Sequence, residues 1–421
     1  MLILMGSVLA ITLVLGFPMK MPLILSAMAV LFTEFPQIGV ATLIREMISG
    51  VETMSLIAVP MFILGAGIMT KGESADRLLD FVASFVRHLQ GGLAITTAAA
   101  CTTFGAISGS TQATVVAMGS PMYPKLLKSG YSSSFSLALI INASDIALLI
   151  PPSIGMIVYG VVTGTSVGTL FIAGIGPGVL IFLMFSVFLI FYSKYMEIPL
   201  QEKATWSERL ESAKSAVLCF GFPILIIGGI YGGFFSPNEA AGMGVLYAFI
   251  LEFFLYRSVS IQDLLDVCLE TGLITAVVFI LIGMGQAFSW IISFARIPNM
   301  ILPPLFGPDP SAIKALLIIA AAYFIGCMIV DNIVVIIVLT PLIYPYAIGA
   351  GVDPIHLGVI VALQAAIGSA TPPFGCDIFT AIAVFRRPYW EVVKSTPPFI
   401  FILLLASLLV IFFPEIALFM V

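Results

Sequence analysis

The stretch FGAISGSTQATVVAMGSPMYP, residues 104–124, and the stretch IGCMIVDNIVVIIVLTPLIYP, residues 325–345, decide the fold of this chain. Both are largely apolar, both carry polar residues near the middle, and both end in Tyr-Pro. Aligning the two stretches residue by residue from their first positions places Asp331 opposite Ser110. A match between segments so far apart indicates an internal repeat, in which two halves of the chain share one architecture.

A pair of prolines follows each stretch at the same distance. The interval from Pro124 to Pro151 equals the interval from Pro345 to Pro372. Each pair removes two backbone donors and excludes the preceding residue from helical geometry, and a nearby glycine lets the chain turn. Each half is therefore predicted to contain a broken helix. The two broken helices are expected at residues 132–163 and 354–385.

The composition places the chain in a bilayer. Hydrophobic residues make up 60% of the 421 residues and charged residues only 9%, with a mean hydropathy of +1.17, values far from those of a soluble domain. A net charge of -5 without a basic run excludes nucleic acid as a partner, and two histidines leave little material for a histidine metal site. An acid near mid-membrane costs roughly 2.5 to 3.5 kcal/mol, so Asp331 is a candidate functional residue.

Apolar runs long enough to cross a bilayer predict ten spans. They lie at residues 1–17, 21–35, 53–70, 132–163, 169–193, 215–235, 238–256, 271–292, 354–385 and 396–420. The stretches 92–124 and 311–346 are too long for one span and carry polar residues at their centres. They are predicted to be re-entrant hairpins whose tips line a cavity, because lipid cannot satisfy free backbone groups. Segment 73–90 is amphipathic and is expected to form an arm helix along the inner surface.

The two repeats are predicted to be inverted, because five spans per half is an odd number. The loop after the first hairpin carries Lys125 and Lys128, whereas its counterpart YPYAIGAGVD has no base, and excess Lys and Arg marks the cytoplasmic side. Both termini are then periplasmic. The expected order is a first repeat at 1–193 with its scaffold at 1–70, a cytoplasmic connector at 194–214, and a second repeat at 215–421 with its scaffold at 215–256.

The charges inside the repeats restrict which substrates can bind there. Four windows contain no Lys, Arg or His, namely residues 104–124, 142–163, 325–346 and 364–385. They contain three aspartates, Asp145, Asp331 and Asp377. An anion cannot bind there alone, so either the substrate is cationic or neutral or cations accompany it. Inverted repeats with broken helices are typical of secondary transporters, whose half-helix ends and unwound carbonyls supply ligands at the midplane.

Oxygen atoms suited to a hard cation such as Na⁺ lie in the same windows. They are the Asp331 carboxylate and the hydroxyls of Ser108, Ser110, Ser153, Ser369 and Thr371. The N-termini of the half-helices carry partial positive charge and would complete a carboxylate site beside bound cations. The sequence therefore favours cation-coupled transport. Asp331 also precedes a predicted helix start, where an aspartate acts as an ordinary N-cap.

The stretches quoted above, together with IPPSIGMIVYG (150–160), FFSPNEAAGMG (234–244) and IGSATPPFGCDIF (367–379), resemble the large membrane subunit of tripartite ATP-independent periplasmic (TRAP) transporters. The resemblance covers essentially the whole chain. It implies an all-α, elevator-type Na⁺/organic-acid symporter of the bacterial inner membrane, without a cofactor. It also implies two partners, a small four-helix membrane subunit and a periplasmic binding protein that delivers the substrate.

The resemblance also implies site residues. One Na⁺ would lie at the first hairpin tip and first break, held by Ser108, Gly109, Ser110, Pro151 and Gly155. Another would lie at the second tip and second break, held by Asp331, Asn332, Gly368, Thr371 and Gly375. The substrate would contact Ser153, Gly155, Ser369 and Thr371. Asp145 and Asp377 are acids where the family pattern has uncharged residues, which leaves the substrate open between a C4-dicarboxylate, sialic acid and another organic acid.

Two other functional classes stay open. An intramembrane hydrolase would need paired aspartates or a serine with a Lys or His partner, and the four windows hold no base. A cation antiporter or an anion-efflux carrier of related architecture is the stronger alternative, and it would work without a binding protein.

Overall fold

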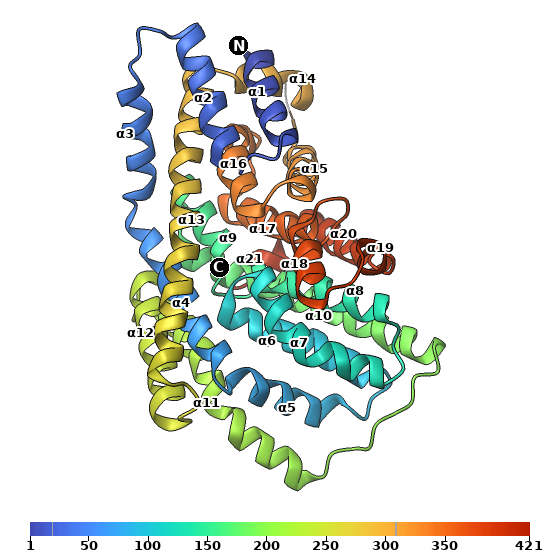
Figure 1. The fold of residues 1–421 in the computed structure, drawn as a ribbon. Coiled ribbons are helices and arrows are strands. Elements are labelled where there is room, and N and C mark those ends of the chain that lie inside the picture. The colour runs from blue at the N-terminus through green and yellow to red at the C-terminus, as the bar shows by residue number, and fades with distance from the viewer. Residues whose placement is uncertain (19, 308–309) are drawn as a thin grey trace.

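A computed structural model describes residues 1–18, 20–307 and 310–421, and all regular structure in these ranges is helical (Figure 1). The first half contains α1 (Leu2–Val14), α2 (Lys20–Glu34), α3 (Val40–Val51), η1 (Met54–Ile57), α4 (Ala58–Lys71), α5 (Ser74–Val86), α6 (Gly92–Ser108), α7 (Thr111–Lys128), α8 (Ser133–Ser144), η2 (Asp145–Leu148), α9 (Ile154–Thr163) and α10 (Val167–Tyr195). Here η1 and η2 are short 3₁₀ segments.

The second half contains α11 (Trp206–Tyr231), α12 (Pro237–Phe249), the π-helical turn η3 (Ile250–Leu255), α13 (Ile261–Phe294), α14 (Pro298–Phe306), α15 (Ala312–Ile329), α16 (Asn332–Gly349), α17 (Pro354–Ser369), α18 (Cys376–Phe385), α19 (Tyr389–Val393), α20 (Pro397–Phe412) and α21 (Glu415–Leu418). We call α1–α4 with α11–α13 the scaffold. We call α6–α10 with α15–α20 the central body.

The helices of the two halves follow the register that the proline spacing predicts. Helix α7 covers 111–128 and α16 covers 332–349, so both ends of the two helices agree with the alignment of Ser110 and Asp331. Helices α8 and α17 begin at 133 and 354, in the same register. Both proline pairs, Pro151–Pro152 and Pro372–Pro373, contain a cis peptide bond. The polar residues SGST and DN fall at the turns between paired helices, as expected for hairpin tips.

Two helices lie where the sequence predicted no element. Helix α3 falls in a segment assigned to no span, because Arg45 and Glu46 interrupt its apolar run while the rest of the helix is amphipathic. Helix α14 occupies the position in the second half that α5 occupies in the first. The span expected at 271–292 is longer, since α13 starts at Ile261 with a capping box between Ser260 and Asp263.

In the part of the chain that the structure describes, seven helices are long and apolar enough to cross a membrane. Among the ten expected spans, α1, α2 and α20 have only 13, 15 and 16 residues, fewer than the roughly 20 that a full crossing needs. Helices α15 and α16 belong to the seven. Length alone therefore does not separate hairpin arms from spans, and the ten full crossings stay a prediction.

The two halves interlock around the long helix α13, drawn in yellow in Figure 1. Helices α2 and α3 of the first half pack against α13, while α12 of the second half packs against α4. A separate apolar cluster joins Leu23 and Leu43 to Phe288 and Ile291 of α13. The remaining buried side chains form one large core that includes the central body. The scaffold thus takes helices from both halves, and so does the central body.

Candidate functional site

The first hairpin tip is a compact turn between α6 and α7. Gly109 adopts a left-handed conformation with φ +60°, and Ser110 is the N-cap of α7. The hydroxyl of Ser108 lies 3.0 Å from that of Thr114, which donates to the Ser110 carbonyl at 2.8 Å. Ser108 and Thr114 are both buried. The polar tip is therefore preorganised by its own hydroxyl groups within an apolar body.

The first tip contacts the first break. The amide of Ile154 donates to the Gly109 carbonyl at 3.3 Å, and a Cβ on Gly109 would lie 2.2 Å from the Pro152 carbonyl oxygen. Only glycine fits this close approach, and its positive φ favours glycine independently. Ser153 caps α9 by accepting from the Met156 amide at 3.3 Å. The N-terminal ends of α7 and α9 thus lie beside one another at this tip.

The second tip and the second break make the corresponding contact. The amide of Phe374 donates to the Met328 carbonyl at 3.1 Å. A Cβ on Gly368 would lie 2.4 Å from Cys327 Cβ, so α17 and the end of α15 are in close backbone contact. Asp331 caps α16 by accepting from the Ile333 amide at 3.0 Å. The N-cap contact expected for Asp331 is therefore present, whatever further role the carboxylate has.

A buried carboxylate joins the first tip to the second break. Asp377, in the first turn of α18, accepts from the Thr111 hydroxyl at 2.8 Å and from the Ser369 hydroxyl at 2.7 Å. Thr111 begins α7 of the first hairpin, and Ser369 ends α17 before the second break. The next residue of α7, Gln112, lies beside Asp331. The first tip and the second break therefore meet at the start of α18.

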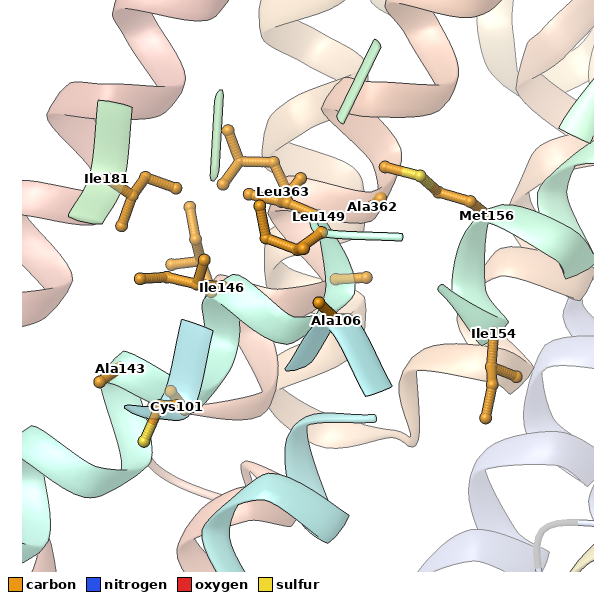
Figure 2. Close-up of a cluster of buried hydrophobic side chains, with 14 of the residues drawn as sticks. Cys101, Ala106, Ala143, Ile146, Leu149, Ile154, Met156, Ile181, Ala362 and Leu363 are labelled. Carbon is orange, nitrogen blue, oxygen red and sulfur yellow. The ribbon is translucent and has the colours of Figure 1, made fainter. Parts of the chain in front are cut away.

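Asp145 occupies a different setting. It is 1% exposed, begins η2 in the first broken helix, and neither of its carboxylate oxygens has a hydrogen-bond partner among the described residues. Its neighbours in η2 are apolar. Leu149, which follows η2, and Leu363 of α17 are among the labelled apolar side chains of this core in Figure 2. Because an isolated carboxylate is costly in such surroundings, Asp145 needs a proton or a cation as a partner.

A cavity of about 210 Å³ separates the first tip from the scaffold. Ser108, Ser110 and Ile154 line it on the side of the central body, and Glu270 and Thr271 of α13 line it on the other. The expectation that a polar tip lines a cavity is therefore met at the first hairpin. The carboxylate of Glu270 is a site feature that the sequence did not single out, because it lies in the polar first turns of a span.

The structure groups the predicted residues into pairs of tip and break, as the repeat implies. Ser108, Gly109 and Ser110 lie next to the first break, and Asp331 and Asn332 close the second tip. The Thr371 hydroxyl donates to the Ile367 carbonyl at 2.6 Å, and the single hydroxyl proton of Ser369 is shared between the Ala366 carbonyl and Asp377, each at 2.7 Å. Thr111 was recognised only as part of the polar tip SGST and Gln112 was not singled out, although the run SGSTQAT extends the polar tip into α7. Whether these groups bind Na⁺ or substrate stays a prediction.

Residues 7–416 match the family model described as "Tripartite ATP-independent periplasmic transporter, DctM component". The chain belongs to this family. It is accordingly a multi-pass membrane transport permease and not an enzyme, which confirms the resemblance seen in the motifs.

Full-length relatives agree with the assignment to the DctM family. The chain is 57% identical to the ectoine TRAP transporter large permease protein TeaC of Halomonas elongata, over 97% of this chain and 96% of that protein. It is also 57% identical to the ectoine/5-hydroxyectoine TRAP transporter large permease protein UehC of Ruegeria pomeroyi, over 97% and 96%. Identity to the C4-dicarboxylate TRAP transporter large permease protein DctM of Pseudomonas aeruginosa is 35%, over 87% and 86%.

The fold of this DctM component also resembles that of a solved transporter. The YdaH transporter of Alcanivorax borkumensis matches 89% of this chain and 87% of its own, with a TM-score of 0.60 and 16% sequence identity. At this identity the likeness concerns the fold alone. It supports an all-helical, multi-span membrane architecture.

Proposed function

We propose that this chain is the large permease of a Na⁺-coupled uptake system for ectoine or a closely similar zwitterion. The observation that carries the proposal is the base-free, acid-bearing centre formed by Asp331 and Asp377, taken with the 57% identity to two permeases named for ectoine. Ectoine carries a delocalised amidinium cation and a carboxylate. A site without a base but with buried carboxylates suits the cation, and bound Na⁺ with helix N-termini suits the carboxylate.

The rest of the system follows from the family. The substrate would be delivered by a periplasmic binding protein, and a small four-helix membrane subunit would complete the permease in the inner membrane. Many apolar side chains of the scaffold are exposed, including Ile44, Leu269 and Leu273, which suits contact with lipid and with such a subunit. The central body would carry the cargo across the membrane relative to the scaffold, in an elevator movement.

The substrate is tested by uptake into proteoliposomes that contain this chain and the small subunit, with the purified binding protein outside. An inward Na⁺ gradient is expected to drive saturable uptake of labelled ectoine that unlabelled ectoine and 5-hydroxyectoine inhibit and succinate does not. The physical reason is that succinate has no cation for the acids of the site. Equal inhibition by succinate would contradict the assignment of a zwitterionic substrate.

The alternative of an antiporter or efflux carrier of related architecture is tested in the same vesicles. TRAP-type transport requires all three components, so omission of the binding protein or of the small subunit is expected to abolish ectoine uptake. Robust Na⁺-driven transport by this polypeptide alone would favour the alternative.

The inverted topology is tested by accessibility of single cysteines at positions 128 and 350. Lys128 ends α7 and Ala350 follows α16, at equivalent places after the two hairpins. In right-side-out vesicles an impermeant maleimide is expected to label Ala350→Cys and not Lys128→Cys, because inverted hairpins open to opposite sides. Exposed Cys268 and half-buried Cys376 are replaced by serine beforehand. Labelling of both positions from one side would refute inversion.

A further inference from the structure

Glu252 is a buried acid far from both hairpin tips. It lies in the π-helical turn η3 at the end of α12 and has no exposed surface. Single π-helical turns occur frequently at functional sites. A carboxylate removed from water must be compensated by hydrogen bonds or by a cation. Its partners therefore indicate what the residue does.

The partners of Glu252 belong mainly to the start of the arm helix α5. One carboxylate oxygen accepts from the Glu73 amide at 3.1 Å and the other from the Ser74 amide at 3.2 Å. The hydroxyls of Ser74 and Ser258 also donate to this carboxylate. Four neutral donors thus surround one acid, and three of them come from the first residues of α5. Such charge-assisted bonds at a helix N-terminus are stronger than neutral ones.

The residue before this contact is a glycine for a steric reason. A Cβ on Gly72 would lie 2.1 Å from a carboxylate oxygen of Glu252 and 2.2 Å from its carboxylate carbon. The chain between α4 and α5 therefore passes directly over the acid. Any side chain at position 72 would displace the carboxylate from the amides that it accepts.

Further contacts hold α5 to the scaffold along its length. The Arg77 guanidinium donates to the Ser215 hydroxyl at 2.8 Å and lies 3.8 Å from the ring centroid of Tyr256. Near the other end of α5, Arg209 of α11 donates to the Ser84 carbonyl at 3.2 Å. The arm helix is accordingly fastened to η3 and α11 at its start and to α11 near its end.

The connection from α5 to the central body is a turn of two glycines. Gly91 has φ +74°, and its Cβ would lie 2.7 Å from the Ser193 hydroxyl of α10. A Cβ on Gly92 would lie 2.2 Å from the Val86 carbonyl oxygen. Between the fastened arm and the first hairpin, the chain therefore changes direction at residues without side chains. Glycine backbone can absorb large φ and ψ changes at such a position.

We propose that Glu252 is a positioning residue that clamps the arm helix to the scaffold, so that the central body moves about Gly91 and Gly92 during transport. This inference rests on the proposed elevator function. The clamp makes α5 a fixed strut, and movement of the hairpin is then confined to the glycine turn. Without the clamp, α5 can move relative to the scaffold. Part of the movement then occurs in the arm helix instead of in the hairpin.

The test combines hydrogen exchange with uptake in the Glu252→Gln variant of the complete transporter. Glutamine keeps the size of the side chain but loses its charge. Its NH₂ group would also face backbone amides and hydroxyls that are themselves hydrogen-bond donors. Exchange of the Glu73 and Ser74 amides is expected to accelerate roughly 10-fold to 150-fold, the scale of a hydrogen bond to a charged group. The maximal rate of ectoine uptake is expected to fall several-fold, while the Na⁺ concentration for half-maximal uptake stays unchanged.

The matched control is Glu239→Gln at the opposite end of the same helix. Glu239 forms a capping box with Ser236 and is not bonded to α5 in the described structure, so exchange in α5 and maximal uptake should not change. Ser258→Ala removes only one donor to the carboxylate and should reproduce the Glu252→Gln pattern at smaller amplitude. This second variant keeps the test decisive if Glu252→Gln folds poorly.

Two outcomes would overturn the clamp. Unchanged exchange at Glu73 and Ser74 shows that the acid does not hold the arm. Faster exchange with an unchanged maximal rate shows that the contact is structural and plays no part in transport. Failure of the proposed function appears separately, as an absence of ectoine uptake by the unaltered transporter, while the exchange measurement still decides whether Glu252 holds α5.

Discussion

The Asp377→Asn variant is expected to raise the KM for ectoine uptake by roughly 10-fold to 150-fold, the scale of a hydrogen bond to a charged group. The carboxylate is fully buried between the first tip and the second break, and no Lys, Arg or His lies in the surrounding windows. Asparagine keeps the size and retains an acceptor for Thr111 or Ser369. What it loses is the negative charge that would pair with the amidinium cation of the substrate.

The control for Asp377 distinguishes loss of the negative charge from loss of a structural hydrogen bond. Thr111→Ala removes one hydroxyl donor to the carboxylate and leaves the charge in place, so the KM for ectoine should change less than in Asp377→Asn. The KM and the maximal rate are measured for each variant in the reconstituted system. An unchanged KM in Asp377→Asn, with a lower maximal rate or a lower melting temperature, would show that Asp377 only joins the two halves.

Local pattern was sufficient for the hairpins and the breaks, because each leaves a signature within a few residues. Polar residues inside an apolar run mark a tip, and a proline pair with a following glycine marks a break. The constant register between the repeats carried this information from one half to the other, so that Ser110 and Asp331 were correctly placed at equivalent positions, and the structure makes both of them N-caps.

The contacts that assemble the site were not predictable in this way. Thr111 and Asp377 are 266 residues apart, and Glu252 and Ser74 are 178 residues apart. A single sequence contains no local signal for such pairs. The sequence places Glu252 at the polar end of a span, and only the contact of η3 with the start of α5 buries it. Helix α3 was missed for the opposite reason, because its charges interrupt the hydropathy used to find spans.

The Asp331→Asn variant is expected to raise the Na⁺ concentration for half-maximal uptake by roughly 5-fold to 150-fold. If the carboxylate balances a bound cation at the second tip, asparagine leaves the ion with neutral ligands only. Ion and substrate affinities are reciprocally linked, so the apparent affinity for ectoine should fall as well. Uptake is measured as a function of Na⁺ concentration at fixed ectoine.

The competing explanation is that Asp331 acts only as an N-cap, and the structure offers a second capping aspartate as a control. Asp331 accepts from the Ile333 amide at 3.0 Å, an N-cap contact that asparagine can make equally well. Asp353 caps α17 in the same manner, accepting from the Ile355 amide at 2.8 Å and the His356 amide at 2.9 Å, but lies away from tip and break. If capping is the only role, Asp331→Asn and Asp353→Asn should both leave the Na⁺ dependence unchanged. A shift confined to Asp331→Asn assigns the charge to the ion, and an unchanged Na⁺ dependence in well-folded Asp331→Asn refutes that role.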